Sequence, residues 1–277
     1  MPGGRLKELY TRVAIAFIGI PIFVAAIWFG KVYFALLIAT FALVGTYELF
    51  TIAEVLEYRP QKWIGYFGVV AVAYIYLHHS ILMVTLILML LTLAALMAEM
   101  FALKEKPLAN TAITLFGLFY TGLFFSSLIG IRESGVFGNY QTAGIFLILL
   151  FTGVWVCDTV AYFYGTRFGK RKLFPEVSPN KSIEGSVAGF VGSLIIFLIA
   201  FFLELLPGFQ LYHALILSAL TGIFGQIGDL IESWLKRTAE IKDSSSIIPG
   251  HGGVLDRFDS MIIVAPLTYV LIQINIL

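Results

Sequence analysis

The stretch Ile81–Leu103 reads ILMVTLILMLLTLAALMAEMFAL and carries one ionisable side chain, Glu99. About 20 mostly apolar residues let an α-helix cross the ~30 Å hydrocarbon core of a bilayer. The run is continuous rather than alternating and too long for a barrel strand, which argues against a β-barrel. This stretch therefore predicts a transmembrane helix, and the fold class depends on how often the pattern recurs.

The composition of the whole chain agrees with this interpretation. Of 277 residues, 59% are apolar and 13% charged, against about 25% charged in an ordinary soluble domain. The mean hydropathy of +0.93 excludes a soluble globule, a disordered tail and a fibrous repeat. A net charge of +1 argues against a nucleic-acid partner. The single cysteine, Cys157, excludes an internal disulfide and a cysteine-based zinc site.

Nine apolar runs of this kind occur in the chain, Ile81–Leu103 included. They predict an all-α, polytopic integral membrane protein with about nine transmembrane helices. We expect the first run to be a retained anchor rather than a cleaved signal peptide. The predicted spans are Val13–Phe29, Val32–Phe50, Trp63–Leu77, Ile81–Leu103, Thr111–Ile131, Thr142–Gly165, Ser186–Leu206, Leu211–Leu235 and Ser260–Leu277.

The basic residues predict how the spans are oriented. With nine spans and a cytoplasmic N-terminus, sixteen of the eighteen Lys and Arg residues fall on the inside, and only Lys31 and Arg132 fall outside. Cytoplasmic loops carry the Lys/Arg excess in membrane proteins. We therefore predict a multi-pass protein of the cell inner (plasma) membrane, with its C-terminus outside and its functional site facing the cytoplasm.

Polarity is concentrated in the second half of the chain. Residues 1–130 are predicted to be N-terminal transmembrane helices for packing and oligomerisation. Residues 131–277 are predicted to be a C-terminal catalytic region with two polar cytoplasmic loops, Arg167–Gly185 and Lys236–Asp259. In the first half, four carboxylates lie near span ends, where we expect them to reach water: Glu48, Glu54, Glu57 and Glu99.

Carboxylates also lie inside predicted spans of the second half, and those on which the argument depends are Asp158, Asp229 and Glu232. A charged group at a helix centre costs about 2.5–3.5 kcal/mol on insertion scales, so such groups are functional candidates. The alternative is that they are helix-end charges at the level of the lipid headgroups.

Two carboxylate pairs flank a glycine-rich turn. Asp229 and Glu232 are three residues apart, as are Asp256 and Asp259, so each pair shares a helix face. Oxygen-rich sites suit Mg²⁺, although helix capping could also explain one aspartate of the second pair. The turn between them, Pro249–Gly253, offers backbone N–H groups to an anion. Together with nearby Lys and Arg, this pattern indicates phosphoryl or nucleotidyl transfer.

The segment Ser233–Asp259, SWLKRTAEIKDSSSIIPGHGGVLDRFD, resembles the signature of phosphatidate cytidylyltransferases, also called CDP-diacylglycerol synthases. The residues that match are Ser233, Lys236, Arg237, Lys242, Asp243, Pro249, His251, Gly252, Gly253, Asp256, Arg257 and Asp259. Upstream, Asp158–Lys172 and Ser178–Gly185 are similar to two further polar segments of that family. There Ser182 stands for the usual Thr and Ile183 for the usual Trp. The resemblance is strong over Asp158–Asp259, whereas the first 130 residues match only as generic spans.

The resemblance implies an enzyme that makes CDP-diacylglycerol and pyrophosphate from CTP and phosphatidic acid, with Mg²⁺ as cofactor. It also implies a homodimer. The number of metal ions, the acyl-chain preference and the contacts to cytosine stay open.

The resemblance also implies roles for individual residues. The metal ligands would be Asp229, Asp256 and Asp259, with Glu232 and Asp158 as second choices. The catalytic residues would be Asp229, Lys236, Arg237, Lys242, Asp243, His251, Asp256, Arg257 and Asp259, with the basic groups neutralising phosphates. The substrate-binding residues would be Asp158, Lys172, Ser178, Lys181, Ser182, Glu232, Gly252 and Gly253.

Three other classes of protein share some of these features. A CDP-alcohol phosphotransferase would need a D-G-x-x-A-R opening, which is missing. An intramembrane prenyltransferase would want Asp-Asp clusters, and the chain contains no Asp-Asp dipeptide. A transporter or channel could use the same intramembrane carboxylates for ions, and only an assay separates it from the enzyme.

Overall fold

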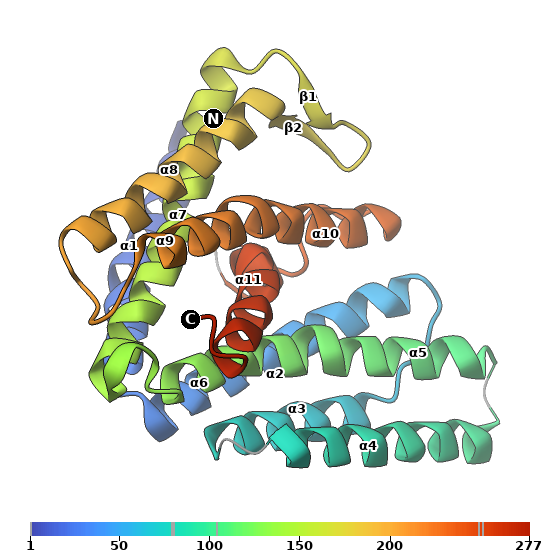
Figure 1. Ribbon diagram of the computed structural model, residues 1–277. Helices are drawn as coiled ribbons and strands as arrows, with labels where there is room; N and C mark the ends of the chain where they lie inside the picture. The colour runs from blue at the N-terminus through green and yellow to red at the C-terminus, as the bar shows by residue number, and fades with distance from the viewer. Residues whose placement is uncertain (1, 79–80, 104, 249, 251) are drawn as a thin grey trace. The chain divides into compact units, whose positions relative to one another are not determined.

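The computed structural model describes residues 2–78, 81–103, 105–248, 250 and 252–277. The described chain is almost entirely helical (Figure 1). Its α-helices are α1 (Pro2–Phe29), α2 (Lys31–Val55), α3 (Lys62–Leu77), α4 (Ile81–Ala102), α5 (Pro107–Gly117), α6 (Phe124–Glu133), α7 (Tyr140–Phe168), α8 (Ile183–Phe202), α9 (Leu211–Ala219), α10 (Gly225–Thr238) and α11 (Leu255–Gln273). Two π-helical turns, η1 (Leu118–Leu123) and η3 (Leu220–Phe224), and one 3₁₀ turn, η2 (Val136–Gly138), complete the helical part.

Every predicted apolar run overlaps a helix, so the all-α class is confirmed, and the lengths of the helices are consistent with a membrane protein. Among the described residues, six helical segments are long and apolar enough to cross a bilayer: Lys31–Val55, Leu82–Ala102, Pro107–Glu133, Tyr140–Phe168, Ile183–Phe202 and Leu211–Thr238. Phe17–Phe29 and Lys62–Leu77 are apolar but shorter. The count of nine spans and the orientation of the termini stay predictions.

The chain forms two compact units, which we describe separately. Unit 1 comprises Met1–Ile129 and Ala239–Arg257, and unit 2 comprises Gly130–Thr238 and Phe258–Leu277. Unit 1 thus contains α1–α5, η1 and the polar loop that precedes α11, while unit 2 contains α7–α10 and most of α11. The assignment of packing to residues 1–130 and catalysis to residues 131–277 stays a proposal.

Unit 1 is centred on α2, α3 and the α5–η1 segment. The Phe50 ring of α2 is 1% exposed and fits between two glycines on neighbouring helices. A Cβ atom on Gly65 of α3 or on Gly117 of α5 would come within 2.5 Å of that ring. These glycines therefore let three helices approach one aromatic side chain, which is how apolar helices pack when lipid offers no hydrophobic driving force.

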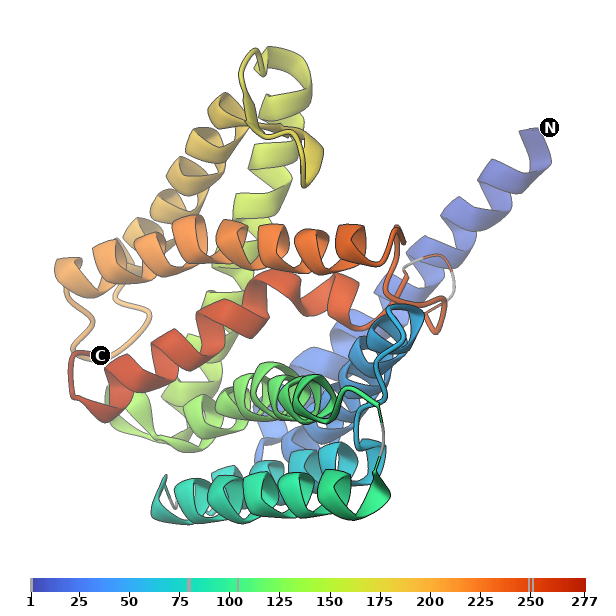
Figure 2. The same cartoon turned by 90° about the vertical axis from the view of Figure 1, so that its right-hand side faces the viewer.

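Unit 2 is built around the pair α7 and α8, which run side by side (Figures 1 and 2). Glycines at positions 185, 189 and 192 of α8 face α7 at a helical spacing. A Cβ on Gly189 would lie 2.7 Å from the Cys157 carbonyl oxygen, and one on Gly185 would lie 2.7 Å from that of Ala161. The absence of side chains lets the two backbones touch, as in small-xxx-small packing.

A two-stranded antiparallel sheet joins these two helices, with β1 (Lys172–Phe174) paired to β2 (Ser178–Ser182). Arg167–Gly185, predicted to be a loop, therefore contains a β-hairpin. Ser182 ends β2 and caps α8, since its Oγ accepts a hydrogen bond from the Gly185 N–H at 3.1 Å. Glu184 then accepts hydrogen bonds from the Lys170 and Arg171 amides at 3.0 and 3.1 Å, which fixes the hairpin to the start of α8.

Candidate active site

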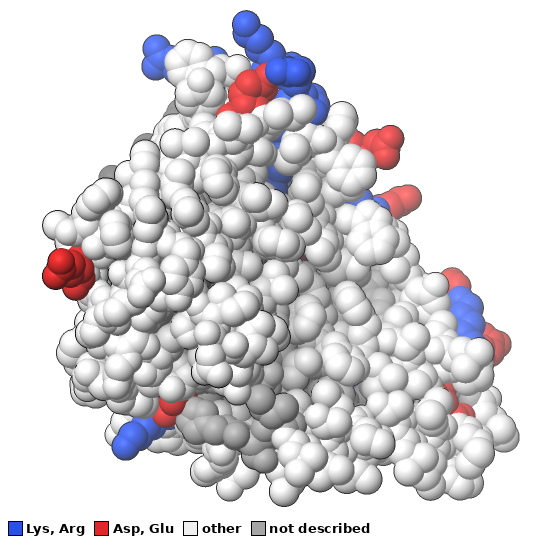
Figure 3. All heavy atoms as spheres, in the orientation of Figure 1, with Lys and Arg blue, Asp and Glu red and all other residues white. Residues whose placement is uncertain are grey.

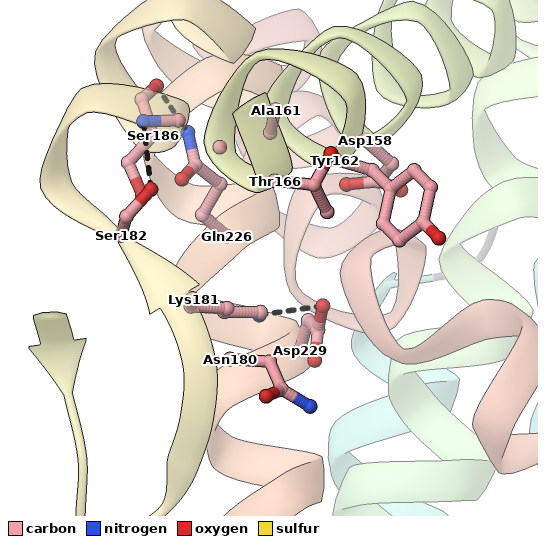
Figure 4. A pocket seen from close by; sticks show the side chains of 12 residues that line it. Asp158, Ala161, Tyr162, Thr166, Asn180, Lys181, Ser182, Ser186, Gln226 and Asp229 are labelled. Carbon is pink, nitrogen blue, oxygen red and sulfur yellow. Dashed lines mark hydrogen bonds and ion pairs between the residues drawn. The ribbon is translucent and has the colours of Figure 1, made fainter. Parts of the chain in front are cut away.

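Unit 2 contains a cavity of about 210 Å³ at the hairpin end of α7 and α8 (Figure 4). Its walls come from α7, β2, the first turn of α8 and α10. Four predicted site residues line it: Asp158, Lys181, Ser182 and Asp229. The cavity therefore gathers side chains from three separate parts of the sequence.

The charged centre of this cavity is an ion pair between β2 and α10. Lys181 points toward Asp229, with Nζ 2.5 Å from Oδ2 (Figure 4). The two side chains are 24% and 27% exposed, while the Nζ atom of Lys181 is itself buried. Ser233, one turn further along α10, donates a hydrogen bond to Oδ1 of Asp229 at 3.3 Å. Asp229 is thus held in place, and Lys181 is aimed into the cavity.

Three further carboxylates surround Asp229. Asp158 of α7 lines the same cavity, and Asp259 of α11 lies within electrostatic range of Asp229, Asp158 and Glu232. Gly228 brings α10 close to α11, because a Cβ there would lie 2.5 Å from the Asp259 carbonyl oxygen. The predicted meeting of Asp229 and Asp259 from two helices is therefore present within unit 2.

The rest of α10 carries one more ion pair. Glu232 is 2% exposed, and its Oε2 lies 2.6 Å from the Nζ of Lys236 one turn later. Arg237 is exposed beyond them. The structure thus pairs the predicted Glu232 with a predicted phosphate-binding lysine.

Basic side chains collect over the hairpin and the end of α7 (Figure 3). The exposed members are Arg167, Lys170, Arg171 and Lys172. Lys172 pairs with Ser182 in the strand register, and the predicted Ser178 pairs with Phe174. This end of unit 2 is therefore positively charged, while the visible helix faces are largely uncharged (Figure 3).

The predicted residues of the glycine-rich loop belong to unit 1. Asp256 opens α11, and its Oδ2 accepts hydrogen bonds from the Ser244 N–H and Oγ, both at 2.9 Å, and from the Gly253 N–H at 2.8 Å. Gly252 has a φ of +78°, which favours glycine. Lys242, Asp243 and Arg257 are exposed. His251 lies outside the described residues.

Glu48 of α2 organises the same loop. Its side chain is fully buried. It accepts hydrogen bonds from the Ser244 and Ser245 hydroxyls at 3.1 and 2.6 Å, and from the Val254 and Leu255 amides, both at 2.9 Å. These amides stand at the start of α11, so a distant carboxylate caps that helix and complements its dipole.

The expectation that Glu48 and Glu99 reach water is wrong. Glu99 is 3% exposed and accepts hydrogen bonds from the Gln61 and Asn110 amides. Glu54 and Glu57 are exposed, as expected. The difference is that Glu48 and Glu99 find buried donors, which offset the cost of removing a charge from water.

Replacing Glu48 with glutamine should destabilise unit 1. The NH₂ group of glutamine is a donor, and it would face hydroxyl and backbone N–H groups that donate to Glu48 in the native protein. Some of these buried donors would lose their acceptor, which costs about 1–3 kcal/mol. We expect the melting temperature in detergent to fall by roughly 3–8 °C. The matched control is Glu57→Gln, since that side chain is 88% exposed. Equal melting temperatures for the two variants would contradict this role for Glu48.

Sequence reasoning missed the side chain that joins α8 and α10. Gln226 lines the cavity, and its Nε2 donates to the Ser186 carbonyl oxygen at 3.0 Å and to that of Gly222 at 2.5 Å. Tyr162, Thr166 and Asn180 also line the cavity and were not singled out. An uncharged glutamine within an apolar span could have been flagged, because such residues often link helices in membranes.

Among the described residues, no group of three or more His, Cys, Asp or Glu side chains converges as a metal site would. The carboxylates near Asp229 therefore lie near one another without converging on a single point. Mg²⁺ in proteins is commonly held by one or two carboxylates together with substrate phosphates and water. Carboxylates arranged in this way are compatible with a Mg²⁺ site that substrate phosphates and water complete.

Comparison with known proteins places the chain in a class. A family model described as "Cytidylyltransferase family" matches residues 10–275. A Bacillus subtilis protein named phosphatidate cytidylyltransferase is 38% identical over 188 residues, which is 68% of this chain and 66% of the relative. Proteins of the same name from Staphylococcus saprophyticus and Staphylococcus haemolyticus are 40% and 39% identical over 164 residues, 59% of each chain.

The chain thus combines helices of transmembrane length with a cavity lined by one lysine and two carboxylates. The chain belongs to the cytidylyltransferase family. The family resemblance in the sequence is thereby confirmed. The matches span about three fifths to two thirds of the length of these curated relatives.

Proposed function

We propose that this protein transfers the CMP group of CTP to phosphatidic acid, giving CDP-diacylglycerol and pyrophosphate. Membership of the family and the names of its relatives support this reaction. The observation that carries the proposal is the Lys181–Asp229 pair, which places a cation and a carboxylate together in one cavity of a membrane-embedded unit.

The reaction needs little proton transfer. An anionic phosphate oxygen of phosphatidic acid attacks the α-phosphorus of CTP, the new P–O bond forms, and the bond to the β-phosphate oxygen breaks as pyrophosphate leaves. Because the nucleophile is already charged, catalysis depends on positioning and on neutralising negative charge. Lys181 supplies a positive charge within the cavity, and the Ser182 hydroxyl lines the same wall.

The basic residues outside the cavity have a second task in this proposal. The exposed Arg167, Lys170, Arg171 and Lys172 would attract CTP from solution and guide it to the hairpin. We propose that this end of unit 2 faces the cytoplasm, where CTP is found. Lys236 and Arg237 of α10 would neutralise phosphates once the nucleotide is bound.

Mg²⁺ fits the donor set of unit 2. Asp229 and Asp259 would hold the ion, with Asp158 as a further oxygen donor, because these carboxylates lie within electrostatic range of one another. When bound, the ion would neutralise phosphate charge and favour the departure of pyrophosphate. The metal role predicted for Asp256 is not carried into this proposal, since Oδ2 of Asp256 already accepts three hydrogen bonds in unit 1.

A labelled-CTP assay tests the function. Purified protein is incubated with CTP labelled in the cytidine, with phosphatidic acid and with Mg²⁺, and the organic phase is counted. We expect labelled lipid that requires all three components. Ion flux in liposomes without labelled lipid would contradict the enzyme and favour a transporter. A homodimer, also proposed, is tested separately by cross-linking in the membrane.

A further inference from the structure

A second hollow lies directly beside the charged cavity in unit 2. It is a groove of about 400 Å³ between α8 and the η3–α10 segment. Its walls are almost entirely apolar and include Leu173, Ile183, Val187, Phe190, Ile223 and Ile227. The groove is therefore suited to hydrocarbon and unsuited to a nucleotide.

The groove and the charged cavity share part of their lining. Ser186 and Gln226 contribute to both. The Gln226 side-chain amide donates to the carbonyl oxygens of Ser186 and Gly222, so this amide is paired with backbone. An occupant crossing this junction would have a charged end at Lys181 and an apolar end between the helices.

A close contact between η3 and α8 bounds the groove. Gly222 lies in the π-helical turn η3, and a Cβ at this position would come within 2.7 Å of the Phe190 ring of α8. A π-turn inserts an extra residue into a helix and is frequent at functional sites. The missing side chain therefore lets η3 pack directly against Phe190, and this contact forms one wall of the groove.

We propose that this groove holds one acyl chain of the phosphatidic acid whose phosphate lies at Lys181. The proposal rests on the proposed function and names the place of the lipid within the same site. From Ile183 to Phe190 the α8 wall runs for roughly 10 Å, about two thirds of one leaflet of a ~30 Å hydrocarbon core. The groove thus accommodates the part of the chain nearest the glycerol.

Blocking the groove tests the proposal kinetically. Val187 and Ile223 are 58% and 48% exposed, so Val187→Trp and Ile223→Trp should fill the groove without disturbing the core. We expect the KM for dioleoyl phosphatidic acid to rise about tenfold. This is the factor expected when about two methylene groups of the acyl chain are no longer buried. The KM for CTP should stay unchanged, and dihexanoyl phosphatidic acid should be affected less.

The matched control is Val191→Trp, which lies one turn further along α8, is 45% exposed and is not part of the groove. Blocked variants that behave like Val191→Trp with the long-chain substrate would overturn the proposal. A wild-type protein that produces no labelled lipid would instead overturn the proposed function.

A binding experiment tests the groove independently of catalysis. Wild-type protein in phosphatidylcholine vesicles is irradiated with phosphatidic acid that carries a diazirine in one acyl chain. We expect adducts on Ile183–Phe190 and Gly222–Leu230 that unlabelled phosphatidic acid competes away. Adducts that are absent from these segments, or that excess phosphatidylcholine removes equally well, would overturn the proposal.

Discussion

Replacing Asp229 with asparagine should abolish CTP-dependent transfer, with a loss of at least about 10²–10³-fold in kcat. The carboxylate has two tasks in the proposed site: it fixes Lys181 through a 2.5 Å ion pair, and it offers oxygen to Mg²⁺. Asparagine keeps the shape but removes the charge on which both depend. The measurement is the rate of labelled-lipid formation at saturating CTP and phosphatidic acid, over a range of Mg²⁺ concentrations.

Two comparisons make this result interpretable. Glu176→Gln is the matched control, since Glu176 is an exposed carboxylate in the same hairpin that does not line the cavity. Asp229→Glu keeps the charge and should recover part of the rate at higher Mg²⁺. An Asp229→Asn protein with near wild-type activity and unchanged Mg²⁺ dependence would refute the assignment of Asp229 to the metal.

The sequence predicts the helices well because apolar runs decide them. Even Trp63–Leu77, short and rich in small residues, lies on a helix, α3. Helix ends were less accurate: α7 continues to Phe168, and α10 keeps Lys236 and Arg237 in its last turn. Charged residues at these ends look like loop sequence, although helical hydrogen bonds continue through them.

The hairpin β1–β2 was not predictable from its residues. Lys172–Phe174 and Ser178–Ser182 are short, polar and without clear alternation. Their pairing depends on Glu184, which binds the Lys170 and Arg171 amides from the start of the next helix. A contact of this kind is tertiary, and local propensity contains no sign of it.

Only part of the candidate site could be predicted from the sequence, because some of its contacts also depend on the tertiary fold. Asp229 could be singled out because a carboxylate within a span is costly, and Asp259 because it lies three residues from Asp256 on one helix face. Glu48 obeys the same rule but was interpreted as a solvated helix end. Its partners, Ser244 and Leu255, lie some 200 positions away in the chain, and only the fold brings them together.

Lys181→Met should be the second variant with a large effect. Methionine keeps the length and packing of the side chain and removes the one cation that the described cavity lining contributes. Losing one preorganised charge at a transferring phosphate costs about 10²–10³-fold in rate. Because Lys181 neutralises phosphate rather than holding metal, we expect higher KM values for the substrates, lower kcat and an unchanged Mg²⁺ dependence.

This pattern separates the two members of the ion pair. Asp229→Asn should change the Mg²⁺ dependence, whereas Lys181→Met should leave it unchanged and weaken substrate binding. Lys31→Met is the control, since Lys31 is an exposed lysine at the start of α2 that does not line the cavity. Lys170→Met tests the outer surface of the hairpin, where exposed basic residues are proposed to guide CTP. If Lys181→Met retained full activity while Lys170→Met lost it, the phosphates would bind on the outer surface of the hairpin. The cavity would then not be where the reaction takes place.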